Sequence, residues 1–257
     1  MNARPSTSAR HLLEQGGRWR EIVATAVSAL ERAGERVGID FLPCDEPWEL
    51  INARANWSID ASLNPRFDPE RGRLNARNYA ALYSIMRPPQ KHRCATTQAI
   101  RLYNWYDGAT LASESRALRV YYDHPDDAKH TEHAIITAPI ADRIHGRVCF
   151  NGAVWVSPDL RGPRPELDGV FVSQIVSALS RMFALYLFDP DWCIATTPED
   201  HFLKGTSERY GWAGIASPCH IENIGNGDVK VRLMWSRRED MLAEAERIAT
   251  EGLRAPG

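Results

Sequence analysis

The segment from Val170 to Phe188 constrains the fold most, because it predicts one long helix between two strands. Its apolar residues recur at steps of three and four, which is the spacing of one helix face. Asp189-Pro190-Asp191 ends this pattern, and apolar runs typical of strands lie at 147–156 and 192–196. This alternation predicts a mixed α/β or α+β fold. The helical stripe consists of Phe171, Ile175, Leu179, Met182, Phe183 and Tyr186.

The flanking patterns predict helices toward the N-terminus and strands farther along the chain. Further helices are expected at 11–37, 46–57, 75–86, 198–208 and 237–250, with a loop at 61–73. Further strands are expected at 97–106, 110–122, 214–221 and 229–235. Asp107-Gly108 and Asn226-Gly227 are hairpin signals between them. We therefore expect a disordered tail at 1–10, a helical region at 11–95 packed on the core, and a sheet domain at 96–257.

Composition excludes several classes of protein. The 257 residues are 44% apolar and carry a net charge of −2, so the balance argues against a nucleic-acid partner. No apolar stretch reaches the ~18 residues of a membrane span, and the first residues lack the apolar core of a signal peptide. The five cysteines form no C-x-x-C pair, which fits free thiols in the cytoplasm. Cys149 and Cys193 lie in apolar strands, where inert buried thiols are the norm.

Two stretches point to a known family. Val156 to Gly162 reads VSPDLRG at the end of a strand, and the long helix follows this loop. Ser207 to Trp212 reads SERYGW, ahead of the terminal hairpin pattern. In this order, from Gln98 onward, the chain resembles the GNAT acyltransferase superfamily. The resemblance implies a mostly antiparallel sheet with a splayed central strand, flanked by helices, and an acyl thioester as co-substrate.

The chemistry of an acyl thioester explains why the residues implied by the resemblance would bind it. A strand that parts from its neighbour at a bulge leaves backbone N–H groups that can bind the acyl carbonyl and the pantetheine amides. Val154 and Val156 are the residues expected to offer them. Loop amides at the start of the next helix would bind phosphate, with Arg161, Gly162 and Arg164 in that loop. The alternative is a fully paired strand and a solvated pair of arginines.

The loop departs from the family pattern, and the departures favour one subgroup. Pro163 and Pro165 remove two N–H donors, and Ser207 stands where the family often has a tyrosine. The chain is similar in this respect to N-acyl amino acid synthases and acyl-homoserine-lactone synthases, which take acyl groups largely from acyl carrier protein. An acidic carrier would suit a face rich in arginine. The residues expected to form that face are Arg161, Arg164, Arg181, Arg237 and Arg238.

Catalysis requires groups that move protons. Glu114, placed on the expected strand 110–122, is the predicted general base for an acceptor amine, and its alternative is a surface carboxylate paired with an arginine. Tyr210 or Ser207 is predicted to protonate or orient the leaving thiolate. The polar segment 124–133 holds three histidines and three acids, but its spacing matches no metal motif, so a solvated loop and no metal are expected.

These patterns predict an N-acyltransferase that moves an acyl group from acyl-CoA or acyl carrier protein to an amine of a small molecule. The alternative is a GNAT-like protein without catalytic activity that senses a ligand or binds another protein. The two hypotheses predict different structures at residues 153–156. An enzyme needs an open gap beside this strand, whereas an inactive module would have the gap filled and its amides paired.

Overall fold

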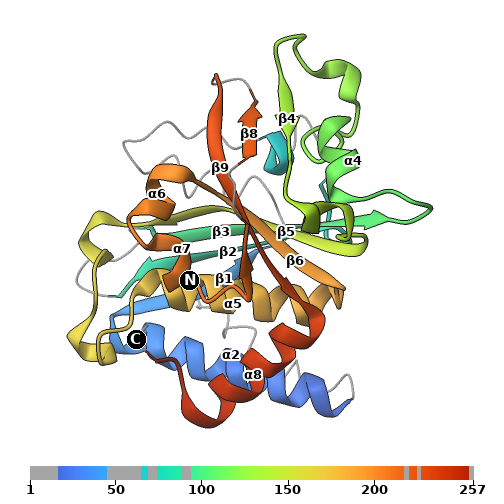
Figure 1. Ribbon diagram of the computed structural model, residues 1–257. Helices are drawn as coiled ribbons and strands as arrows, with labels where there is room; N and C mark the ends of the chain where they lie inside the picture. The colour runs from blue at the N-terminus through green and yellow to red at the C-terminus, as the bar shows by residue number, and fades with distance from the viewer. Residues whose placement is uncertain are drawn as a thin grey trace.

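The computed structural model describes residues 17–44, 65–68, 74–87, 94–216, 220–224 and 227–254. They form a mixed α+β fold around a nine-stranded, mostly antiparallel sheet, shown in Figure 1. In these ranges no helix has the length and apolar character needed to cross a membrane.

Most of the sheet follows one path of hydrogen-bonded neighbours, β1-β2-β3-β5-β6-β9-β8-β4, and β7 pairs with β9. Its strands are β1 (Ile39–Cys44), β2 (Tyr79–Met86), β3 (Cys94–Trp105), β4 (His133–Ile135), β5 (Gly146–Val156), β6 (Trp192–Pro198), β7 (Gly214–Ile215), β8 (His220–Asn223) and β9 (Val229–Arg237). The pair β5–β6 is parallel, and the other pairs between these strands are antiparallel.

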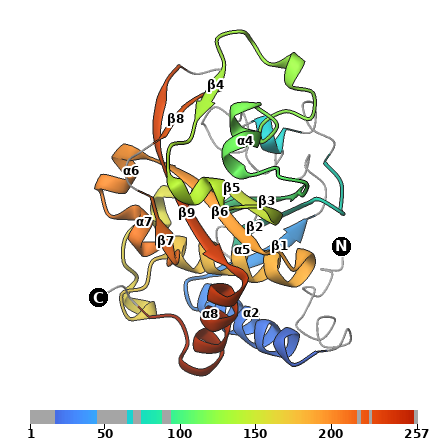
Figure 2. The same cartoon turned by 45° about the vertical axis from the view of Figure 1, so that its right-hand side comes forward.

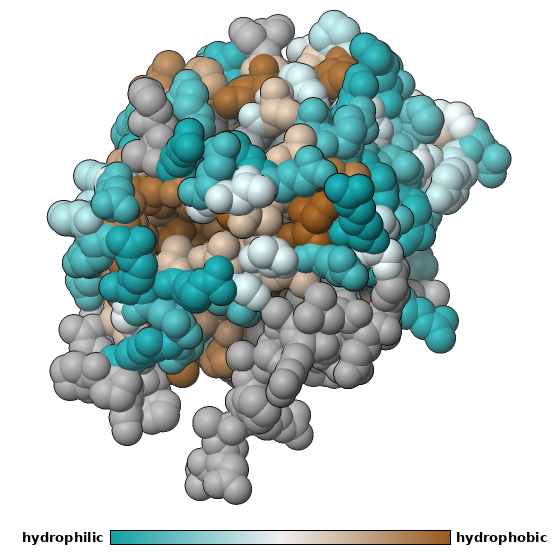
Figure 3. Space-filling model, turned by 90° about the horizontal axis from the view of Figure 1, so that it is seen from below, coloured by the Kyte–Doolittle hydropathy of each residue, from teal (hydrophilic) through white to brown (hydrophobic). Residues whose placement is uncertain are grey.

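Three long helices cover one face of the sheet. They are α2 (Arg18–Arg36), α5 (Val172–Phe188) and α8 (Arg238–Glu251), and they lie below the sheet in Figure 1. Most residues of α5 are buried, and its apolar side chains join α2 and the sheet in one core. Polar side chains, Arg181 among them, are buried on this helix as well. From below, this layer presents mostly hydrophilic residues with apolar residues recessed between them, as Figure 3 shows.

Shorter elements cover the other face. The helix α4 (Leu111–Arg116), the short turn η1 (Pro65–Phe67) and the β4 segment lie on the side of the sheet opposite α2 and α8, visible in Figure 2. A second core, rich in aromatic side chains, fills the space between them and the sheet. It contains most of the aromatic residues of 103–122, which therefore serve as packing.

Two predicted elements were wrong. Residues 75–86 form a turn and the strand β2 instead of a helix, because β2 lies inside the sheet and buries both faces, which gives a continuous apolar run without period-two alternation. Residues 110–122 form α4 and turns instead of a strand. Thr110 caps this helix, since its hydroxyl accepts from Ser113 N at 3.3 Å.

Other expectations were confirmed in part. The predicted helical region 11–95 contains α2, but it also contributes β1 and β2 to the sheet, so it is not a separate helical unit. The predicted helix 198–208 is interrupted at Gly205, which has a φ of 68°, and splits into α6 (Glu199–Leu203) and α7 (Thr206–Arg209). The predicted tail at 1–10 and helix at 46–57 lie outside the described residues.

Candidate functional site

The central strands β5 and β6 part halfway along their length. They pair in parallel over only three residues each, from Val148 opposite Trp192 to Phe150 opposite Ile194. Beyond this point β5 continues to pair with β3, and β6 continues to pair with β9. A gap in the hydrogen-bond ladder therefore opens beside residues 151–156, on the side of β5 that faces β6.

A bulge turns β5 at the start of this gap. Ala153 has a φ of 53°, in the left-handed region, and the register between β3 and β5 shifts at this point. Val154 has no residue opposite it in either β3 or β6. The Thr97 hydroxyl donates to the Ala153 carbonyl at 3.0 Å, which fixes the bulge from the β3 side.

The backbone of Val156 faces the gap. Ser157 N donates to Ala95 O at 2.8 Å, so residue 157 uses its backbone groups toward β3. Successive residues of an antiparallel ladder face alternate edges, so the N–H and C=O of Val156 point the other way, toward the gap. Its carbonyl accepts from Arg161 Nε at 3.0 Å, and among the described strands none pairs with Val156 on that side.

The loop after β5 bends around the mouth of the gap. A short turn, η4 (Pro158–Leu160), follows Ser157, and Arg161 folds back onto Val156 as described. Gly162 has a φ of 96°, a conformation that side chains disfavour, and no atom lies within 4 Å of where its Cβ would be. The loop reaches Phe171, which precedes the first turn of α5, where backbone N–H groups lack partners within the helix.

A cavity of about 530 Å³ occupies this region. It extends from the end of β5 across the loop and the first turn of α5 to α6 and α7, which lie beside that end of the sheet in Figure 1. The residues that line it are Val154, Trp155, Val156, Leu160, Arg161, Gly162, Phe171, Val172, Ser173, His201, Lys204, Arg209 and Tyr210. Four of the five predicted binding residues, all but Arg164, thus lie in one wall with Tyr210.

The lining of the cavity favours an anion. Arg161, His201, Lys204 and Arg209 lie around it, and none of its lining residues is acidic. Within the part of the chain that the structure describes, neither Arg161 nor Lys204 forms an ion pair. The N-terminus of α5 adds the positive end of a helix dipole. Together these groups can bind phosphate, while Trp155, Phe171 and Val172 offer apolar surface to the rest of a ligand.

Tyr210 supplies a proton donor to this cavity. Burial raises the pKa of its hydroxyl above the usual value, and the nearby positive charges of Arg209 and Arg161 only partly oppose this effect. The hydroxyl therefore stays protonated at neutral pH. It lines the same cavity as Val154 and Val156.

Comparison of the chain with protein-family models and with curated proteins finds no match. A search of the described residues for three or more histidine, cysteine, aspartate or glutamate side chains grouped as metal ligands finds none.

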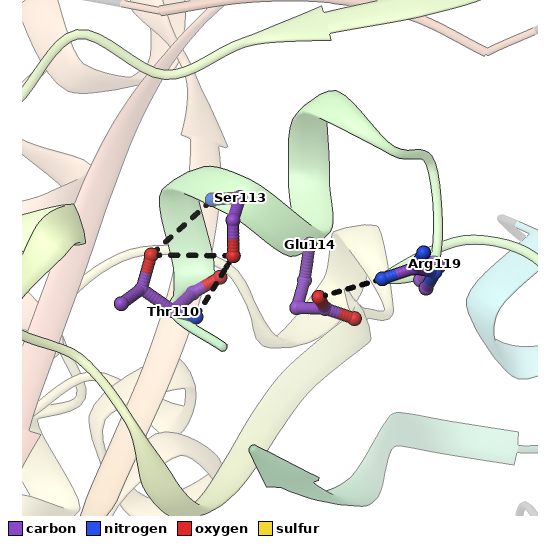
Figure 4. A network of polar contacts seen from close by, with 4 residues as sticks. All are labelled: Thr110, Ser113, Glu114 and Arg119. Atoms are coloured by element: carbon purple, nitrogen blue, oxygen red, sulfur yellow. Dashed lines mark hydrogen bonds and ion pairs between the residues drawn. The ribbon is translucent and has the colours of Figure 1, made fainter. Parts of the chain in front are cut away.

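Glu114 lies away from this cavity, and its predicted place on a strand was wrong. It belongs to α4, on the other side of the sheet, and its carboxylate pairs with Arg119 Nη1 at 3.1 Å (Figure 4). Thr110 and Ser113 cap the same short helix, as Figure 4 also shows. The Glu114 side chain is buried and already forms an ion pair with Arg119. It therefore resembles a structural, paired carboxylate more than a general base.

The other predicted residues are dispersed. Ser207 lies in α7, and its side chain is outside the described residues. Arg164 pairs with Glu166 at 3.4 Å outside the cavity. Arg181 is fully buried against Glu244, whereas Arg237 and Arg238 lie at the end of β9 and the start of α8. The five arginines therefore do not form a single face.

Three basic residues of the cavity, His201, Lys204 and Arg209, were not predicted from the sequence. They reach the cavity because α6 and α7 lie beside it. A signal was present, since all three lie in the polar stretch that precedes Tyr210, but only the fold brings that stretch beside Arg161. The two strand cysteines were read correctly as buried thiols, and burial raises the pKa of Cys193 to about 12.

Proposed function

We propose that the protein is an N-acyltransferase that takes an acyl group from a thioester, on coenzyme A or on a carrier protein, and transfers it to a primary amine. The observation that carries this proposal is the opening between β5 and β6 at the Ala153 bulge, next to a cavity with basic and apolar walls. The order of strands and helices and the parted central strand support the resemblance to the GNAT superfamily.

The thioester would bind along β5 in place of the missing strand. The Val156 N–H faces the gap and can donate to an amide of the pantetheine arm or to the acyl carbonyl. The phosphate end of the arm would lie at the start of α5, where helix amides, Arg161 and Lys204 favour negative charge. Trp155 and Phe171 provide surface for the apolar parts of the donor.

The reaction itself is a direct transfer. The neutral amine attacks the carbonyl carbon of the thioester, and the carbonyl oxygen takes up negative charge that a backbone N–H of β5 stabilises. The C–N bond forms, the C–S bond breaks, and the sulfur leaves as a thiolate. Tyr210 donates its proton to this thiolate, and the proton released by the amine nitrogen returns to Tyr210 through solvent. The products are an amide and a free thiol.

The test is a binding and turnover experiment with defined donors. The purified protein is titrated with coenzyme A, acetyl-CoA, a long-chain acyl-CoA and an acyl carrier protein charged with the same long chain. Each donor is then incubated with a mixture of primary amines, and the products are identified by mass spectrometry. Saturable binding of a thioester and an amide product support the proposal. Absence of both with every donor contradicts it.

A further inference from the structure

The carbonyl oxygen of Val156 faces the gap beside β5, and a side chain of the protein already occupies it. Ser157 N donates to Ala95 O at 2.8 Å toward β3, so the carbonyl of the preceding residue points to the other edge of the strand. Arg161 Nε donates to this carbonyl at 3.0 Å. The arginine therefore stands where an amide N–H of a ligand bound in place of the missing strand has to donate.

Arg161 uses only part of its hydrogen-bonding capacity in this contact. A guanidinium group carries several N–H donors, and the bond to Val156 involves Nε alone. Within the described residues no carboxylate forms an ion pair with Arg161. The residue is exposed, so its remaining donors can meet an anion that arrives from solvent.

The cavity offers Arg161 an alternative partner of this kind. Arg161 lines it together with Val172 and Ser173 at the start of α5, where backbone N–H groups lack partners within the helix. Lys204 adds a second positive charge, and none of the described lining residues is acidic. A phosphate bound among these groups can pair with the guanidinium through parallel N–H···O bonds, which are stronger than the single bond to the neutral carbonyl of Val156.

The loop leaves room for the arginine to change partner. Gly162, the next residue, has a φ of 96°, and no atom lies within 4 Å of the place where its Cβ would be. Arg161 itself lies on the surface of the loop rather than in either core. Rotation of its side chain from the carbonyl toward the start of α5 therefore displaces no core residue.

We infer that Arg161 selects the thioester donor by its phosphate. Without phosphate the guanidinium holds the Val156 carbonyl. A phosphate at the start of α5 draws the guanidinium away, and the carbonyl then accepts an amide N–H of the pantetheine arm. The inference rests on the proposed function for the identity of the arm. It commits the donor to thioesters of phosphopantetheine, whose phosphate is common to coenzyme A and to a carrier protein, against thioesters that lack it.

The test compares two donors that differ only in the phosphate, S-acetylpantetheine and S-acetyl-4′-phosphopantetheine. Each is titrated into the full chain without amine, and binding is followed by ligand-observed NMR. Acetyl-CoA and an acetylated acyl carrier protein are titrated alongside, and the tighter of these two identifies the source of the phosphate. R161M keeps an unbranched side chain and removes the guanidinium, whereas R161K keeps a positive charge. R143M removes the charge of an exposed arginine that does not line the cavity, and is the control.

We expect the wild type and R143M to bind the phosphorylated donor at least about tenfold more tightly than S-acetylpantetheine. R161M should bind the phosphorylated donor about tenfold more weakly than the wild type does. It should bind S-acetylpantetheine about threefold more tightly, because the Val156 carbonyl is no longer occupied. R161K should retain a preference for the phosphorylated donor. Equal weakening of both donors in R161M overturns the inference, and so does unchanged binding of both.

Addition of primary amines to the same samples separates this inference from the proposed function. If the donors bind as expected but no amide forms, the role of Arg161 stands and the transferase proposal fails. If amide forms and R161M keeps the donor preference of the wild type, only the inference fails. If no donor binds to the wild type or to R161M, both fail.

Discussion

Phe67 packs directly on Gly152, and a Cβ atom at position 152 would lie 2.4 Å from the ring carbon Cε2 of Phe67. Gly152 immediately precedes Ala153, the residue that forms the bulge beside the gap. The short turn η1, which contains Phe67, therefore packs on the sheet next to the bulge of β5. A glycine is needed at 152 because a side chain and the Phe67 ring cannot occupy the same space.

The first prediction concerns this contact. G152A should lower the free energy of unfolding by about 1–3 kcal/mol, since the added methyl group overpacks a buried position. Urea unfolding followed by circular dichroism measures the change. The double variant G152A/F67L should lose less than the sum of the two single variants, because the smaller side chain makes room for the methyl group. Strictly additive losses would contradict the contact.

The second prediction concerns the charge of the larger cavity. K204E should weaken binding of acyl-CoA by about fivefold, because it replaces an exposed positive charge on the cavity wall by a negative one. Calorimetric titration at low and high salt measures the effect, which should shrink as salt rises. K230E, an exposed lysine of β9 that does not line this cavity, is the control. Equal weakening by both variants would point to net charge alone.

The third prediction concerns Tyr210. Y210F should lower kcat for acyl transfer by about a hundredfold and leave donor binding nearly unchanged, since the ring remains and only the proton donor is lost. Because burial raises the pKa of Tyr210, the wild-type rate should not fall through loss of this proton between neutral pH and about pH 10. Steady-state kinetics over this range test both points. Y186F, on a tyrosine of α5 outside the cavity, should leave kcat unchanged.

The fourth prediction concerns a buried ion pair between two helices. Arg181 of α5 is fully buried, and its guanidinium donates to Glu244 of α8 at 2.8 and 2.6 Å. E244Q should reduce the free energy of unfolding by about 3–5 kcal/mol, because it leaves the arginine charge buried without a counterion. Replacing both residues by apolar ones, in R181M/E244L, should cost less than E244Q. Urea unfolding compares them, and a larger loss in the double variant would refute this account.

The fifth prediction concerns pH. The folded protein lowers the pKa of His220, so below about pH 6.5 the unfolded chain takes up a proton at this ring that the folded chain does not. The free energy of unfolding should therefore decrease as the pH falls from about 7 to about 5.5, and this slope should be smaller in H220Q. An unchanged slope in H220Q would contradict the assignment.

The helix α5 and the strand before it could be predicted from the sequence because their signals are local. An apolar stripe at helical spacing predicts a helix over Val172–Phe188 whatever it packs against, although the fold buries this helix on nearly all sides. The loop VSPDLRG likewise marks the end of β5. The strand β2 could not be predicted, because a run of apolar residues fits a strand buried on both faces as well as a helix, and the neighbours that decide between them are β1 and β3.

Some residues of the candidate site could likewise be predicted from the sequence, and others could not. The sequence by itself indicated the backbone residues Val154 and Val156, the loop residues Arg161 and Gly162, and Tyr210, because they follow one another in a recognisable order. Only the tertiary structure decided that β6 leaves β5 after Phe150, that Lys204 reaches the cavity, and that Glu114 pairs with Arg119 away from it. The periodicity of a helix and the order of residues in a loop depend on residues that are close together in the sequence. Strand pairing and the burial of a charge depend on residues far away in the chain, which the fold alone brings together.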